Sequence, residues 1–207
     1  MNMDKGRILK ASDLLPMKAG HTISKGLSET FVVFSMAPDT DISPEIHYED
    51  KCYYVFGGDA TVAGLALTTG DLAVIEKNTP LGVHTEDGAY LLEGTWKDGH
   101  DMKLEKGKIL HLKDQIDYVD GAIANVDIAK NKNLKFALLA FDEGQGLTPH
   151  TAPGDALIVA LEGRAKVTMG DIEATMEAGD QFVFEKGKSH SVSAISRFKM
   201  AILLVID

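Results

Sequence analysis

Two histidines in the second half of the chain, His150 and His190, are the residues best placed to do chemistry. His150 lies just before an apolar run, Leu157 to Leu161, which is bounded by Pro153 and Gly163, and His190 follows a second short apolar run and a Lys-Gly turn. Branched apolar runs between Gly and Pro turns predict buried strands. Two imidazoles on separate strands, each beside a turn, predict a small pocket into which both rings point.

The length and composition fit a soluble globular protein. The 207 residues include 44% hydrophobic and 25% charged side chains, and the net charge is −10. Because nucleic acids and anionic membranes attract clustered Lys and Arg, this charge disfavours both as partners. The amino-terminal sequence has no apolar core of signal-peptide type, and no apolar run approaches the roughly 18 residues of a membrane helix. We expect a cytoplasmic monomer or homodimer whose partner is a small molecule.

Cys52 is the only cysteine. The chain therefore forms no intrachain disulfide and no thiolate zinc cluster. Its position in the apolar segment KCYYVF predicts a strand interior, where Cys acts as a small buried apolar residue and not as a catalytic thiol.

The chain also repeats itself, which bears directly on how many domains it has. Four pairs of matching positions define the repeat, at offsets of 101, 105, 105 and 109: Gly6 and Gly107, Phe31 and Phe136, Gly58 and Gly163, Gly70 and Gly179. Offsets that grow in steps of four are typical of loop insertions between strands that keep their register. The sequence therefore predicts a tandem duplication, with an N-terminal domain at residues 1–100 and a C-terminal domain at residues 101–207.

Each copy consists mainly of short apolar segments separated by Gly, Pro, Asn and Asp. Examples are VVFSM, CYYVF and LAVIE in the first copy, and ALIVAL, QFVFE and MAILLVI in the second. Many short strands with regular turn signals predict an all-β sandwich or barrel. The charged segment at residues 97–108, KDGHDMKLEKGK, is the expected connection between the two domains.

The second copy resembles the cupin family. The first cupin motif is Gly, five residues, His-x-His, three or four residues, Glu, six residues, Gly; the second is Gly, five residues, Pro-x-Gly, two residues, His. The matching positions are Gly144, His150 and Gly163 for the first motif, and Gly179, Gly187 and His190 for the second. The resemblance implies an all-β chain of two tandem cupin barrels, of the double-stranded β-helix or jelly-roll type. The second half is similar to small single-domain bacterial cupins of unassigned function.

The resemblance also implies a metal site, from which the second copy departs. Cupins that bind a metal use both histidines and the glutamate of the first motif with the histidine of the second, a set suited to Fe, Mn, Ni, Cu or Zn. Ala152 and Ala156 replace the second histidine and the glutamate. His150 and His190 remain as candidate ligands. Asp155 is the candidate third ligand, or the carboxylate that fixes an imidazole tautomer, provided that a turn or bulge re-aims it toward the His150 face.

The first copy keeps fewer of the ligands that the family implies. Glu45 and His47 occupy the two histidine positions, while Lys51 and Leu81 replace the glutamate and the last histidine. A lysine and a leucine disfavour a metal ion there. Tyr53 and the residue after it alternate across a strand, so one of them lines this pocket, and Tyr53 is our candidate. We expect a structural or ligand-shaping domain, with Glu45, His47 and Tyr53 as candidate ligand-binding residues.

Two functions remain open at this point. The first is non-enzymatic or sensory binding of a small molecule in the second barrel. The second is a metal-dependent enzyme of the dioxygenase or isomerase type, in which His150 and His190 bind one divalent transition metal. The missing family ligands favour the binding function, whereas the fold itself does not decide between the two.

Overall fold

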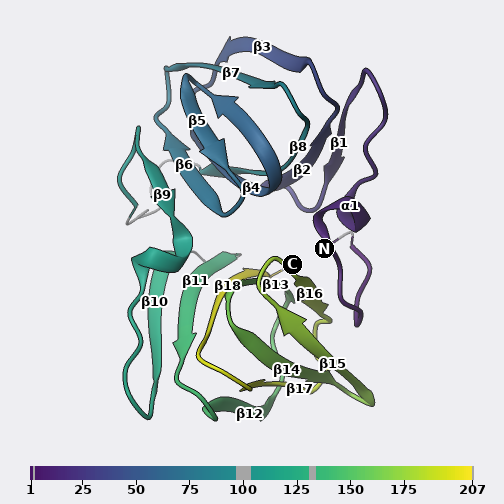
Figure 1. The fold of residues 1–207 in the computed structure, drawn as a ribbon, viewed down its shortest axis with the longest axis vertical. Helices are drawn as coiled ribbons and strands as arrows, with labels where there is room; N and C mark the ends of the chain where they lie inside the picture. The colour runs from purple at the N-terminus through teal and green to yellow at the C-terminus, as the bar shows by residue number, and fades with distance from the viewer. Residues whose placement is uncertain (2, 97–103, 131–133, 207) are drawn as a thin grey trace. The chain divides into compact units, whose positions relative to one another are not determined.

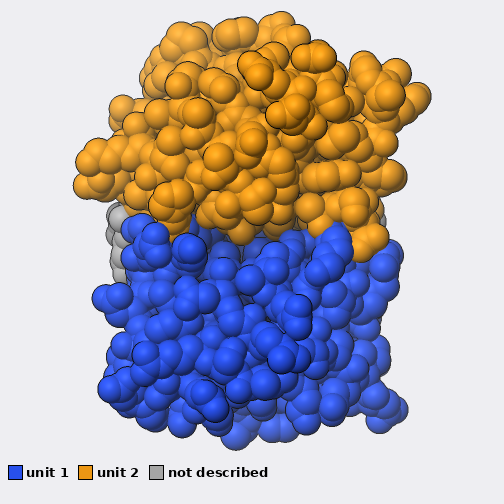
Figure 2. Space-filling model, viewed as in Figure 1, with its two compact units in different colours: residues 1, 3–10, 112–207 blue, residues 2, 11–111 orange. Residues whose placement is uncertain are grey.

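The computed structural model describes residues 1, 3–96, 104–130 and 134–206. The described residues form two compact units, coloured separately in Figure 2. Unit 1 comprises Met1, Met3–Lys10 and Leu112–Asp207, and unit 2 comprises Ala11–His111. This division differs from the expected boundary between residues 100 and 101 in two segments: residues 3–10 pack with the C-terminal repeat, and residues 104–111 pack with the N-terminal repeat.

Unit 2 is a barrel of antiparallel strands (Figure 1). Its elements are α1 (Ala11–Leu14), β1 (Thr22–Gly26), β2 (Phe31–Met36), β3 (Thr40–Ile46), β4 (Asp50–Val62), β5 (Leu65–Thr68), β6 (Asp71–Ile75), β7 (Pro80–Thr85), β8 (Ala89–Trp96) and β9 (Ile109–His111). The strands hydrogen-bond in the order β1-β2-β8-β4-β6-β9 on one side and β3-β7-β4-β5 on the other, and the long strand β4 belongs to both. Residues from both sides, including Tyr53, Val55, Val83 and Leu91, form one buried core. Cys52 is also buried, and burial raises the pKa of its thiol to about 12, as an inert apolar role requires.

Unit 1 repeats this architecture (Figure 1). Its elements are η1 (Leu112–Gln115), β10 (Ile123–Lys130), β11 (Leu134–Phe141), β12 (Gly146–His150), β13 (Asp155–Glu162), β14 (Arg164–Met169), β15 (Ile172–Glu177), β16 (Gln181–Phe184), β17 (His190–Ala194) and β18 (Phe198–Val205). One sheet has the order β10-β11-β18-β13-β16 and the other β12-β17-β14-β15. No helix among the described residues has the length and apolarity needed to cross a membrane.

The strand registers of the two units agree down to their irregularities. Two register shifts recur in both units, and the residues on either side of each shift lie 105 positions apart in the two units. The equivalent residues are Ile42 and Leu147, Glu45 and His150, Val55 and Ala160, and Gly57 and Glu162. A β-bulge changes the local direction of a strand, so a shared bulge position is a stronger match than shared strands alone. The all-β fold with two tandem barrels, predicted from the sequence, is confirmed.

A short segment before each repeat covers a sheet edge, and this explains the division into units. The N–H of Leu9 donates to the carbonyl of Gln181 at the outer edge of β16, and the N–H of Gln181 donates back to Leu9, both at 2.8 Å. In unit 2, β9 pairs with β6 in the same manner, and the N–H of Gly107 donates to Val74 at 2.8 Å. We call these segments, residues 3–10 and 104–111, the two arms. Each arm pairs N–H and C=O groups that an edge strand leaves exposed.

The last residue of each arm is held by an equivalent aspartate. Lys10 forms an ion pair with Asp180 in unit 1, and His111 contacts Asp71 in unit 2. Each aspartate also closes its own turn, because Asp71 accepts the N–H of Thr68 and Asp180 accepts that of Glu177, both at 2.9 Å. The resemblance between Gly6-Arg-Ile-Leu and Gly107-Lys-Ile-Leu in the sequence therefore marks the two arms.

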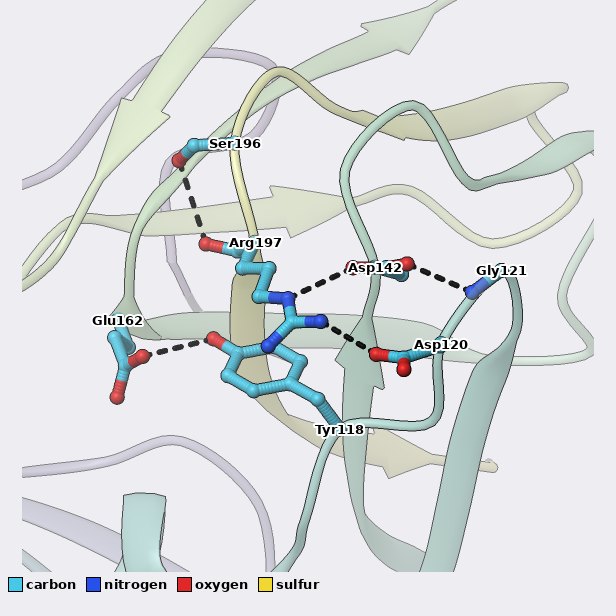
Figure 3. Close-up of polar contacts among 7 residues, drawn as sticks. All are labelled: Tyr118, Asp120, Gly121, Asp142, Glu162, Ser196 and Arg197. Atoms are coloured by element: carbon cyan, nitrogen blue, oxygen red, sulfur yellow. Dashed lines mark hydrogen bonds and ion pairs between the residues drawn. The ribbon is translucent and has the colours of Figure 1, made fainter.

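Within unit 1, a polar cluster holds the loop after η1 against the strands (Figure 3). The Arg197 guanidinium donates to Asp142 at 2.8 Å and to Asp120 at 2.6 Å, and it lies 5.3 Å from the ring centre of Tyr118. The Tyr118 hydroxyl donates in turn to Glu162 at 2.9 Å. The aspartates raise the pKa of Arg197, so the guanidinium stays charged. A cation–π contact and two ion pairs on one Arg hold this loop against the ends of β11, β13 and β18.

Candidate functional site

The two sequence-predicted histidines lie side by side in unit 1. His150 ends β12, His190 begins β17, and the two residues form a cross-strand pair. Their ring centroids are 4.5 Å apart with the planes tilted by 59°. His190 is buried whereas His150 is exposed, so the pair extends from the barrel interior to the surface.

Backbone carbonyls select the same neutral tautomer for both rings. Nδ1 of His150 lies 2.8 Å from the Thr148 carbonyl, and Nδ1 of His190 lies 2.9 Å from the Lys188 carbonyl. Because a carbonyl only accepts hydrogen bonds, Nδ1 carries the proton in each ring, and Nε2 is left as an acceptor or ligand. Burial, with a smaller contribution from His150, lowers the pKa of His190 against the opposing effect of the Lys188 carbonyl. The His190 ring is therefore neutral at pH 7.

The inner side of the pair is apolar. The His190 ring stacks on Phe184, with centroids 4.2 Å apart and planes 15° from parallel. Phe184 pairs with Ala156 across the sheet, and both belong to the buried core of unit 1 together with Ile158 and Met169. The arrangement combines two nitrogen acceptors with the wall of an aromatic and aliphatic core.

Asp155, the expected third ligand, is engaged elsewhere. Its carboxylate lies 2.7 Å from the Met1 amino group and 2.8 Å from Nζ of Lys5, and it accepts the N–H of Lys186 at 2.9 Å. Strand alternation places Asp155 on the opposite face from Ala156, and no bulge at its position turns it back. In the part of the chain that the structure describes, no three His, Cys, Asp or Glu side chains are grouped to hold a metal ion.

The ion pairs of Asp155 predict a stabilising role. Burial by itself raises the pKa of the Asp155 carboxyl, but the bonds from Lys5 and the other donors outweigh it and lower the pKa to about 2. A carboxyl whose pKa is lower in the folded than in the unfolded state stabilises the fold above the unfolded value and loses that effect as pH falls. We expect Asp155→Asn to lower the free energy of unfolding by about 2 kcal/mol at pH 7.

Urea unfolding at several pH values checks this expectation. The difference between wild type and Asp155→Asn should shrink as pH drops below the ordinary Asp value and vanish only below about pH 2. Asp127→Asn is the control, since Asp127 pairs with Lys135 through a half-exposed bond. A difference that does not change with pH would contradict the ion-pair explanation.

The candidate residues of the N-terminal barrel are only partly brought together. Glu45 and Leu81 form the cross-strand pair equivalent to the two histidines; Glu45 is exposed and Leu81 is buried. His47 is half-buried, and its carbonyl accepts the N–H of Asn78 at 2.7 Å. Tyr53 lies in the buried core.

Tyr53 belongs to a polar network that sequence reasoning did not find. The Glu93 carboxylate accepts a hydrogen bond from the Tyr53 hydroxyl and one from Nζ of Lys51 at 2.7 Å, and Nζ of Lys51 also donates to Oγ1 of Thr95 at 2.8 Å. We call Lys51, Tyr53, Glu93 and Thr95 the β4–β8 network. Its signal in the sequence is Glu93 itself, a charged residue inside the apolar run AYLLEGTW.

Comparisons with known proteins agree with this architecture. Residues 137–206 match the family model for the cupin domain. A cupin 2 conserved barrel domain protein from Leptotrichia buccalis superposes with a TM-score of 0.81 at 24% identity, over 99% of this chain and 98% of that one. A salicylate 1,2-dioxygenase from Pseudaminobacter salicylatoxidans superposes with a TM-score of 0.64 at 14% identity, over 96% and 84%. A search of curated proteins finds none that matches the sequence.

The half-length matches fit the duplication. A cupin superfamily protein from Desulfitobacterium hafniense covers 52% of this chain with 99% of its own length, at 24% identity and a TM-score of 0.50. Two equivalent barrels in one chain define a bicupin fold. The C-terminal half therefore matches the cupin domain in sequence, and the whole chain has the fold of tandem cupin barrels.

Proposed function

We propose that the C-terminal barrel binds a small organic molecule whose hydroxyl or amine groups donate hydrogen bonds to His150 and His190. The observation that carries this proposal is the paired tautomer: both Nδ1 atoms are occupied by backbone carbonyls, which leaves two Nε2 acceptors on adjacent rings. The buried Phe184 ring, which stacks on His190, makes the inner end of the site apolar, and this suits an apolar or aromatic ligand body.

The alternative is a metal-dependent enzyme of the dioxygenase or isomerase type, and the same two Nε2 atoms are its only support. The residues present do not fit a retained metal well. Catalytic sites for Zn²⁺ use three protein ligands, whereas Asp155 is held by Lys5 and Ala156 offers no donor. We therefore favour a ligand that needs two acceptors and no metal ion.

Binding of phenol and catechol, followed through the imidazole proton resonances, tests the proposal. We expect both probes to shift the His150 and His190 signals saturably, and His150→Ala or His190→Ala to weaken binding about 5- to 100-fold, the effect of one lost hydrogen bond. His84→Ala is the matched control, because His84 is an exposed histidine of the other barrel. Unchanged binding in both His variants would refute the proposed site.

Metal addition separates the two functions. If the site is metal-free, chelator should leave phenol and catechol binding unchanged. Mn²⁺, Ni²⁺ or Zn²⁺ retained in stoichiometric amount after dialysis, and lost in His190→Ala, would favour the enzyme instead.

Ligand binding at the histidine pair should weaken as pH falls. Protonation of His190 converts Nε2 from an acceptor into a donor, so a ligand that donates to it is lost when the ring is charged. Because burial lowers the pKa of His190, the contribution of this ring to binding should persist through pH 6.5 and be lost only at lower pH. Calorimetric titration of catechol between pH 5 and 8 measures this; binding that strengthens on acidification would contradict the assigned protonation state.

A further inference from the structure

The β4–β8 network makes the N-terminal barrel polar where the C-terminal barrel is apolar. In unit 2, Lys51 pairs with Thr95 and Tyr53 pairs with Glu93 across β4 and β8. At the equivalent positions of β13 and β18 in unit 1, Ala156 pairs with Leu204 and Ile158 pairs with Ile202. The shared bulges after Val55 and Ala160 fix this correspondence.

The network lies on the inner face of its barrel. Tyr53 is in the buried core with Ile75 and Leu91, residues contributed by other strands. Lys51 is two residues away on the same strand and therefore faces the same side. The side chains of Lys51 and Glu93 keep 12% and 13% exposure, so the ion pair borders solvent and is not sealed in the core.

The fold does not require this ion pair. Moving two charges out of water costs free energy that their attraction only partly recovers, and replacing such a pair with apolar residues of similar size is often neutral or stabilising. The C-terminal barrel carries that replacement at the equivalent positions, and its core is intact. Because the C-terminal barrel packs without these charges, packing does not account for the network in the N-terminal barrel.

The unused hydrogen-bonding capacity of the network indicates what would bind. Nζ of Lys51 has three donors, of which Glu93 and Thr95 take two. Each Glu93 oxygen accepts one bond and retains a further lone pair, and the hydroxyl of Thr95 can itself donate. Donors and acceptors thus lie next to each other, and the charges of Lys51 and Glu93 cancel.

We propose that the β4–β8 network is a second ligand site, which binds a neutral polyhydroxy compound such as a sugar or polyol. A hydroxyl group both donates and accepts, so two neighbouring hydroxyls match an adjacent ammonium and carboxylate. An anionic ligand is disfavoured because Glu93 lies within 2.7 Å of Nζ of Lys51, and because the whole chain carries a net charge of −10. The site is independent of the histidine pair of unit 1.

Titration with glucose, myo-inositol and glycerol, with acetate as the anionic counterpart, tests this site. We expect at least one of the neutral probes to shift the Ile75 and Thr95 resonances saturably at concentrations up to roughly 100 mM, a range that saturates a Kd near 10 mM. The His190 resonances should not move. Thr95→Val, which is close in size, should weaken binding about 5- to 100-fold.

A combined variant copies the residues of the C-terminal barrel into the network, with the substitutions Lys51→Ala, Tyr53→Ile, Glu93→Ile and Thr95→Leu. This variant should fold but bind none of the probes. Lys135→Ala, which removes an ion-paired lysine of unit 1, is the control and should bind as wild type does. Saturation by acetate with none by the neutral probes would overturn the ligand class. Absence of saturation by every probe would overturn the site.

Discussion

Gly163→Ala should destabilise the protein by about 3 kcal/mol or more, because this position cannot hold a side chain. Gly163 has φ 76°, a conformation that costs an L-residue roughly 1 kcal/mol, and a Cβ atom there would lie 1.8 Å from the carbonyl oxygen of Arg197. The backbone of β13 or β18 must move to relieve that overlap. Since β13 and β18 form the centre of the unit 1 sheet, the shift would spread into the core.

Gly170→Ala is the matched control for this substitution. Gly170 also has a positive φ, 58°, but a Cβ atom there meets nothing within 4 Å. Its variant should therefore lose only about 1 kcal/mol, the cost of the left-handed conformation. Thermal and urea unfolding of the two variants measure the difference. Equal losses would show that backbone conformation alone, and not the contact with Arg197, constrains Gly163.

The duplication explains why so much of the fold could be predicted from the sequence. Gly58 is equivalent to Gly163, has φ 78°, and its Cβ would lie 2.0 Å from the Gly88 carbonyl oxygen. A glycine required twice by the same close approach is retained in both copies, so the repeat is visible in the sequence. Strand periodicity and glycine spacing therefore locate the barrels, and through them the facing positions of His150 and His190.

The parts that sequence reasoning did not find depend on long-range contacts. Strand alternation turns Asp155 away from the histidines, but the ion pair that it forms there joins it to Lys5, 150 positions earlier in the chain. Glu93 and Thr95 lie on β8, and only the register of β8 against β4 brings them to Lys51 and Tyr53. Neither pairing leaves a periodic trace along the chain.

The two arms account for the difference in domain boundaries, and they predict that neither repeat is complete by itself. A fragment of residues 1–100 lacks the arm of residues 104–111, which pairs with β6, and a fragment of residues 101–207 lacks the arm of residues 3–10, which pairs with β16. Each fragment would expose an open sheet edge, and the fragment of residues 101–207 would also lose the buried arm residue Leu9. We expect each fragment alone to be poorly folded or to self-associate.

Mixing the two fragments should restore both barrels, because each then receives the arm carried by the other. Size-exclusion chromatography should show a 1:1 complex, and hydrogen exchange at Gln181 should slow to the rate in the intact chain, since the N–H of Gln181 donates to the carbonyl of Leu9 in the arm. In a fragment of residues 101–207 that carries Leu9 and its neighbours as an added N-terminal segment, the β16 amides should regain protection without the partner. A fragment of residues 101–207 that is monomeric and fully protected at Gln181 by itself would show that the arm is dispensable, and that the boundary near residue 101 divides two self-sufficient domains.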